Sequence, residues 1–168
     1  EAEKATVAMS EDKRPNYIRL TREPTAVFTT DSTPFEIGKA QIFRKGTDIT
    51  IIATGTMTYQ ALLSAESLAK DGISAEVLHC ATIKPLDEAA ILKSVKKTGL
   101  VITAEEAQIA GGLGGAVAEL LSENLPTKLK RIGIKDRFGE SGKPEELLRA
   151  LGLTHTHITL AAHELINT

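Results

Sequence analysis

The sequence predicts an α/β domain built around a largely parallel sheet. Short apolar runs rich in β-branched residues alternate with longer segments in which apolar residues recur at helical spacing. Strands that alternate with helices are joined by right-handed crossovers, and these crossovers place helices on both faces of the sheet. A length of 168 residues is enough for one such core, with some residues left over at one end.

The first part of the chain differs from the rest. Glu1–Met9 is expected to be the tail of a helix that began before this chain, since no N-cap precedes it, and Asn16–Leu20 is expected to be a strand. Thr21–Pro34 is rich in threonine and proline and is expected to form no element of its own. A connection of this length is more typical of an interdomain linker than of the interior of a domain.

A regular order of elements follows. The first strand is expected at Lys39–Arg44 and, because a tight turn follows it, should run antiparallel to its neighbour in the sheet. The later strands are expected at Ile49–Ala53, Ser74–His79, Leu100–Ala104 and Lys130–Ile134. The helices are expected at Tyr59–Lys70, Asp87–Thr98, the glycine-rich segment up to Asn124, Pro144–Leu151 and Thr154–Ile166. Asp87 has the side chain and the position of an N-cap.

Composition excludes several classes of partner. The 20 basic and 22 acidic residues nearly cancel, which argues against nucleic acid or an anionic membrane as the main partner. Aromatic residues make up only 4%, so a platform for stacking bases is not expected. No apolar run approaches the roughly 20 residues of a membrane span, and no signal-peptide pattern is present. Cys80 is expected to be a buried thiol, and the protein to be cytoplasmic.

A glycine-rich stretch opens the helix that follows the third parallel strand. Backbone N–H groups at such a helix start attract phosphate. The spacing matches neither the dinucleotide fingerprint nor the P-loop, and no lysine falls between Lys97 and Lys128. The glycines are therefore interpreted as places where the helix start approaches another backbone closely, in the domain or at an interface: Gly111, Gly112 and Gly114.

Glu105 and Glu106 stand between that strand and the glycines. Consecutive strand residues point to opposite faces, so the two carboxyl groups are not expected to share a proton. The hypothesis is that one of them caps the glycine-rich turn while the other reaches a partner, and no catalytic residue is assigned to this chain.

The loop Asp-Arg-Phe-Gly-Glu-Ser-Gly follows the last strand. Asp136 and Arg137 are expected to belong to a structural ion-pair network, with Phe138 as its buried anchor. Ser141 has no activating histidine beside it, which argues against a hydrolase. The four histidines are too scattered for a metal site.

Arg22 stands just past the expected strand Asn16–Leu20. Two interpretations are open from spacing alone. An arginine at this position class of an α/β protein can bind an anionic ligand, because its guanidinium suits bidentate phosphate recognition. A surface ion pair with Glu23 is the alternative.

Five motifs in this order resemble the C-terminal domain of transketolases. They are Ile37-Gly-Lys-Ala, Gly46-Thr-Asp-Ile-Thr-Ile-Ile-Ala-Thr-Gly55, Ile83-Lys-Pro-Leu-Asp87, Glu105-Glu106 with Gly111-Gly-Leu-Gly114, and Asp136-Arg-Phe-Gly-Glu-Ser-Gly142. Deoxyxylulose-phosphate synthases and the β subunits of 2-oxoacid dehydrogenases share the third motif and the glycine-rich helix. The last motif favours transketolase over both.

The resemblance implies a three-layer α/β/α domain with a five-stranded mixed sheet at residues 36–168. It further implies that residues 1–24 are the end of a preceding pyrimidine-binding domain and that residues 25–35 are the linker. Leu20-Thr-Arg22 is similar to a family pattern whose arginine contacts the phosphate of the sugar substrate, so the resemblance assigns Arg22 to substrate binding.

The resemblance also implies an activity for the whole enzyme. Transketolases transfer a two-carbon ketol unit between sugar phosphates of the pentose phosphate pathway, as dimers that use thiamine diphosphate and Mg²⁺. The N-terminal diphosphate-binding and pyrimidine-binding domains, or a separate subunit, hold these cofactors. The C-terminal domain is structural and serves assembly, so this chain alone is expected to be inactive and to bind no cofactor. A non-catalytic regulatory or scaffold module is the alternative from another class.

Overall fold

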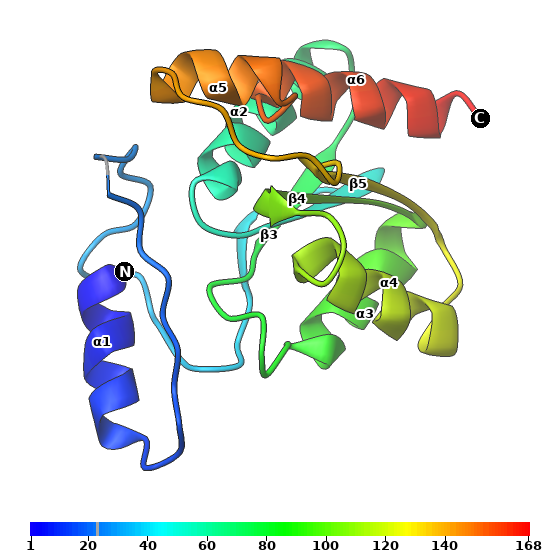
Figure 1. Ribbon diagram of the computed structural model, residues 1–168. Helices are drawn as coiled ribbons and strands as arrows, with labels where there is room; N and C mark the ends of the chain where they lie inside the picture. The colour runs from blue at the N-terminus through cyan, green and yellow to red at the C-terminus, as the bar shows by residue number, and fades with distance from the viewer. Residues whose placement is uncertain (23) are drawn as a thin grey trace.

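The computed structural model describes residues 1–22 and 24–168, and Figure 1 shows the arrangement of their helices and strands. In chain order the elements are α1 (Ala2–Glu11), β1 (Gln41–Arg44), β2 (Ile49–Ala53), α2 (Met57–Lys70), β3 (Ala75–His79), α3 (Glu88–Thr98), β4 (Leu100–Gln108), α4 (Leu113–Asn124), β5 (Lys128–Ile134), α5 (Pro144–Ala150) and α6 (His155–Ile166). None of these helices is long and apolar enough to span a bilayer.

The five strands form one mixed sheet in the order β1-β3-β2-β4-β5, which confirms the predicted fold class. β1 is antiparallel to β3, and the other pairs are parallel. The register sets Ile51 of β2 beside Val77 of β3 on one side and Ile102 of β4 on the other. Because β3 lies between β1 and β2, the turn after β1 does not join two paired strands.

Helices cover both faces of the sheet (Figure 1), as the alternating pattern predicted. On one face α2, α5 and α6 pack on a cluster that includes Ile51, Leu68 and Ile158. On the other face α3 and α4 pack on a cluster that includes Ile52, Leu78 and Val117. The strands β2 and β3 are buried along their whole length, since both of their faces are covered.

Local signals explain where helix α3 begins and ends. The carboxylate of Asp87 accepts a hydrogen bond from the backbone N–H of Ala90 at 3.1 Å, which makes it the N-cap. Its second oxygen accepts the N–H of Ala40 at 3.0 Å and ties the helix start to the segment before β1. Gly99 ends the helix with a φ of 71°, a left-handed conformation that glycine adopts without strain.

The expected strand at Asn16–Leu20 is wrong. Those residues belong to none of the strands in the described chain. A strand needs a neighbour for its backbone hydrogen bonds, and this segment lies outside the order of the sheet. Tyr17 and Leu20 are 87% and 59% exposed.

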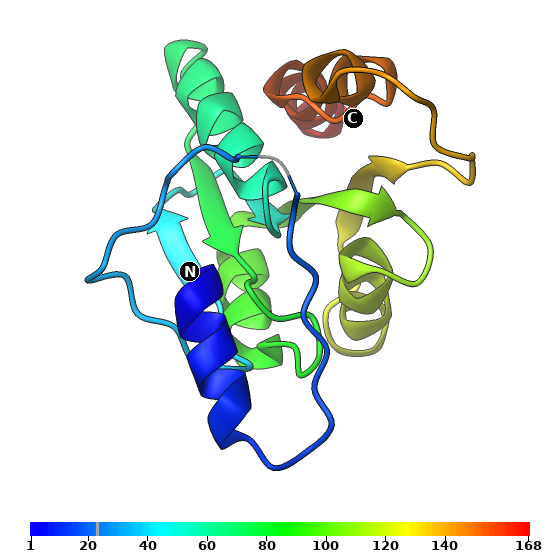
Figure 2. The ribbon, with the colours of Figure 1, turned by 60° about the vertical axis from the view of Figure 1, so that its left-hand side comes forward.

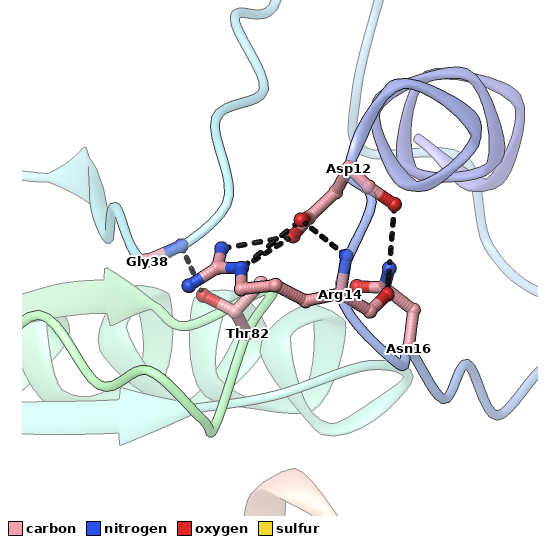
Figure 3. Close-up of polar contacts among 5 residues, drawn as sticks. All are labelled: Asp12, Arg14, Asn16, Gly38 and Thr82. Atoms are coloured by element: carbon pink, nitrogen blue, oxygen red, sulfur yellow. Dashed lines mark hydrogen bonds and ion pairs between the residues drawn. The ribbon is translucent and has the colours of Figure 1, made fainter.

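The turn before this segment is held by an ion pair, which Figure 3 shows. The Arg14 guanidinium donates hydrogen bonds to the Asp12 carboxylate, and these bonds lower the pKa of that carboxyl.

The expected linker, residues 25–35, is held by two sets of contacts, one to α1 and one to the sheet. The Lys4 ammonium of α1 donates to the backbone carbonyls of Asp31, at 2.7 Å, and of Thr30 and Thr33. Phe28 lies edge-on to the rings of Phe43 and His79. The segment therefore packs against β1 and β3, although it forms no helix or strand.

Candidate functional site

The carboxyl ends of β2, β3, β4 and β5 meet at one edge of the sheet, called here the carboxyl edge. The chain passes from β2 to β3 on one side and then crosses to β4 on the other, so the strand order reverses between β2 and β4. Crevices at such a reversal are the usual place for ligands in open α/β sheets. Glu105 and Glu106 lie at this edge, near the end of β4, and the glycine-rich start of α4 follows them.

Glu105 closes the glycine-rich start of α4. Its two carboxylate oxygens accept the backbone N–H groups of Leu113 and Gly114, each at 2.8 Å. The side chain is almost fully buried. A carboxylate is favourable here because the N–H groups at a helix N-terminus carry partial positive charge. The chain's own carboxylate thus fills the position that a phosphate would take in a nucleotide-binding protein.

The glycines make room for that carboxylate. A Cβ at position 112 would collide with a Glu105 carboxylate oxygen. A Cβ at position 114 would lie 2.9 Å from Thr103 Oγ1 and 3.0 Å from Glu105 Oε1. Gly111 differs from both, because nothing lies near its Cβ position; its φ of 78° is the constraint. Close approach therefore occurs at Gly112 and Gly114, within the domain.

Glu106 points away from Glu105, since β4 extends to Gln108 instead of ending at Ala104 and both acids are strand residues. Its carboxylate accepts a hydrogen bond at 2.6 Å from the hydroxyl of Thr56, which precedes α2. Its backbone carbonyl accepts a hydrogen bond at 3.0 Å from the guanidinium of Arg19. The contact between Thr56 and Glu106 thus links the segment after β2 to the end of β4, and Arg19 ties the N-terminal segment to the same place.

Neither Thr56 nor Arg19 was singled out from the sequence. Thr56 lies three residues after β2, and Arg19 lies within the segment that was expected to be a strand. The only signal in the sequence is the position of Thr56 after a buried strand, because loops at that edge carry functional residues in this class of fold.

Arg22 lies on the exposed surface, three residues after Arg19. Its assignment to a substrate phosphate stays a prediction. The alternative partner, Glu23, lies outside the described residues, so the ion pair between the two remains an interpretation of the sequence alone.

The loop after β5 is held by Gln108. The side-chain amide of Gln108 donates to the carbonyl of Arg137 and accepts the N–H of Asp136, both at 3.0 Å. Arg137 pairs with Glu140. The expected burial of Phe138 is wrong, because its side chain is 96% exposed. The Gln108 amide holds the backbone of the two residues just before Phe138 in this surface loop.

The other candidate reactive groups within residues 1–22 and 24–168 do not form a site. Burial, and secondarily the charge of Asp87, raises the pKa of the Cys80 thiol to about 12, so it stays protonated and unreactive at neutral pH. His79 is buried and has both ring nitrogens engaged, with Thr58 Oγ1 and Glu1 Oε1, each at 2.7 Å. Residues 1–22 and 24–168 contain no group of three or more metal-ligating side chains.

The fold and motifs agree with comparisons to known proteins. The sequence model of the family described as transketolase, C-terminal domain, matches residues 38–158. A 6-deoxy-6-sulfo-D-fructose transketolase subunit of Clostridium sp. is 51% identical over 150 residues, which are 89% of this chain and 47% of that protein. A 1-deoxy-D-xylulose-5-phosphate synthase of Trichormus variabilis is 44% identical over 126 residues, 74% of this chain and 20% of the synthase.

Similarity extends to a solved structure. A split gene transketolase, described as an inactive β4 tetramer, superposes with a TM-score of 0.84 at 39% identity. The match covers 87% of this chain and 48% of that one. This chain therefore spans about half the length of both the solved relative and the Clostridium subunit.

Proposed function

The chain belongs to the transketolase C-terminal domain family, and on that premise we propose that it is the structural and assembly part of a larger thiamine-diphosphate-dependent transketolase. The whole enzyme would transfer a two-carbon ketol unit between sugar phosphates. The diphosphate-binding and pyrimidine-binding domains, in the same chain or in a separate subunit, would hold thiamine diphosphate and Mg²⁺. The intact enzyme would be a homodimer.

The observation that carries this proposal is the position of Glu105. The one glycine-rich helix start of the described chain, where the diphosphate of a cofactor could sit, is filled by a buried carboxylate. A second anion there would meet that negative charge. The described residues also offer no cluster of carboxylates for Mg²⁺. These residues do not fit the cofactor, which supports a structural role for this part of the enzyme.

A titration tests the structural role directly. We expect isothermal titration of the purified chain with thiamine diphosphate and Mg²⁺ to give no binding, and a ketol-transfer assay of the chain alone to give no product. Binding of thiamine diphosphate at micromolar concentration would overturn the proposal.

The role proposed for Arg22 has a distinct kinetic signature. Arg22→Ala in the intact enzyme should raise KM for sugar phosphates by roughly 10- to 100-fold, since a charge-assisted hydrogen bond contributes about 1.5–3 kcal/mol. Unphosphorylated sugars should be affected far less. Arg14→Ala is the matched control, because the Arg14 guanidinium binds Asp12 of the same segment. An equal change in KM for phosphorylated and unphosphorylated sugars would contradict phosphate binding by Arg22 and favour the ion-pair interpretation.

The anion that Arg22 meets is open to a second test. The Clostridium relative is named for a 6-deoxy-6-sulfo sugar, in which a sulfonate stands where a sugar phosphate carries phosphate. Guanidinium groups bind both anions. Comparing phosphorylated with sulfonated donors in the same assay would tell which anion this enzyme prefers.

Synthesis of deoxyxylulose phosphate is the second candidate function. The 44% identity to a 1-deoxy-D-xylulose-5-phosphate synthase favours it specifically. The two activities differ in the donor, so the intact enzyme is assayed with pyruvate and with xylulose phosphate. Turnover of xylulose phosphate without pyruvate supports transketolase, and turnover that requires pyruvate supports the synthase.

A further inference from the structure

The loop between β5 and α5 presents Phe138 to solvent. Its side chain is 96% exposed, more than any other large apolar side chain in the described part of the chain. Figure 2 shows this segment reaching the right-hand edge of the molecule, away from α1. The next residue, Gly139, has no heavy atom within 4 Å of its Cβ position, so the surface beside the ring is also open.

Fixed contacts on the residues just before the ring hold the loop in this shape. Before the ring, the Gln108 amide clamps the backbone of Asp136 and Arg137. Asp136 has a φ of 45°, the only positive φ among the described non-glycine residues. The contacts of Gln108 therefore fix the backbone of the two residues that precede the exposed Phe138.

A large exposed aromatic ring on a fixed loop has the properties of an interface anchor. Aromatic side chains bury much area for little loss of conformational freedom, and they are enriched among the residues that dominate binding. The Gln108 amide and the left-handed conformation of Asp136 fix the backbone just before Phe138. The ring is therefore presented from a fixed position, as the anchor of an interface would be.

The charges of the loop favour a second copy of the same loop as the occupant. Lys135, Arg137 and Lys143 stand beside Asp136 and Glu140, so the loop carries both signs and a net charge of only +1. In a contact with two-fold symmetry each patch meets itself, and a patch of a single sign would repel its copy. A loop that carries both signs can place opposite charges facing each other across the axis. The related split gene transketolase chain is described as a β4 tetramer, an assembly of like chains.

We propose that Phe138 anchors a two-fold contact between copies of this chain, and that Gln108 is the positioning residue that holds the loop for it. The inference deepens the assembly role proposed above and rests on it. Two rings, each next to a bare Gly139, would pack across the symmetry axis. Arg137 and Glu140 would flank them at the rim of the contact.

Sedimentation equilibrium of the chain over a range of concentrations tests this contact. Phe138→Ser should raise the dimer dissociation constant at least tenfold, because it removes the ring and leaves the fold untouched. Gln108→Ala should raise it by a smaller factor, since the ring is present but no longer held. Val27→Ser is the matched control, because Val27 is 88% exposed on the N-terminal segment. Circular dichroism should show all three variants folded.

Three outcomes would overturn the inference. One is a chain that stays monomeric up to its solubility limit, and another is an unchanged dissociation constant in Phe138→Ser. The third is loss of binding to the cofactor-bearing domains in Phe138→Ser while self-association persists, which would identify those domains as the occupant. The proposed function fails separately, by cofactor binding to the isolated chain, so the two failures are distinguishable.

Discussion

Gly114→Leu is expected to prevent stable folding of the domain. A side chain at position 114 would meet Thr103 Oγ1 at 2.9 Å, and both Arg131 Cδ and Glu105 Oε1 at 3.0 Å, from its Cβ alone. Gly114 is buried, so the larger atoms of leucine have no route to solvent. Overpacking of this kind costs about 1–3 kcal/mol.

The same substitution also displaces the Glu105 carboxylate from its hydrogen bonds with the start of α4. The N–H groups of Leu113 and Gly114 would then be buried without acceptors. Each unsatisfied group adds about 1–3 kcal/mol. These terms add up to roughly 3–9 kcal/mol, a large part of the 5–15 kcal/mol by which domains are stable.

Gly115→Leu is the control for this experiment, because the two glycines are adjacent in the same helix. Nothing lies within 4 Å of a Cβ at position 115. Leucine is a better helix former than glycine, so this variant should be as stable as the wild type or more stable. Urea denaturation followed by circular dichroism measures both. A folded Gly114→Leu variant with wild-type stability would show that the helix start is not held by close packing.

Most of the sheet could be predicted because its strands carry their own signal. The first four residues of Ile49–Ala53 are all β-branched, and the structure places β2 at this segment. The N-cap at Asp87 and the stop at Gly99 depend only on neighbouring residues, so they too can be read locally. These features can be predicted without knowing which residues from distant parts of the chain pack against them.

The errors fall where the outcome depends on distant partners. Asn16–Leu20 has the residue types of a strand, but no strand of the described chain lies beside it. Phe138 has the residue type of a core anchor, yet Gln108, far away in the sequence, fixes the loop that exposes it. Residue type shows which structures a segment can adopt, and contacts with distant residues determine which one it adopts.

The candidate site was predictable in part for the same reason. The alternation rule predicts that Glu105 and Glu106 point apart, because both lie on one strand. That Glu105 reaches back to the helix start, and that Thr56 meets Glu106, depends on how β4 lies against α4 and α2. Gly112 and Gly114 suggested a close approach without revealing that the approaching group is a carboxylate.

A buried polar cluster on the opposite side of the domain was not predicted at all. Glu76 of β3 is fully buried under α3, where its carboxylate accepts hydrogen bonds from Ser94 and Lys97. Ser94 also contacts Thr50 of β2 at 3.0 Å. In the sequence Glu76 is one acid within a short strand, and nothing local indicates that its charge is buried and paired.

Glu76→Ala is expected to destabilise the domain by about 3 kcal/mol at neutral pH. Removing one partner of a buried ion pair costs about 3–5 kcal/mol. We expect the lower end because Lys97 is 42% exposed and can return to water. Glu66→Ala is the control: that acid is exposed on α2, and surface changes usually stay within about 0.5 kcal/mol. Urea denaturation at pH 7 gives both values.

The pH dependence separates the charge of Glu76 from its packing. Burial alone would raise the pKa of Glu76, but the hydrogen bonds from Lys97 and Ser94 outweigh it, and the pKa lies below its ordinary value of 4.5. A lowered pKa in the folded state adds stability above the ordinary value, and this stability is lost as pH falls through the folded-state pKa. The difference in free energy of unfolding between wild type and Glu76→Ala should therefore become smaller below pH 4.5. If this difference stays constant on acidification, the stability lost in Glu76→Ala comes from packing alone.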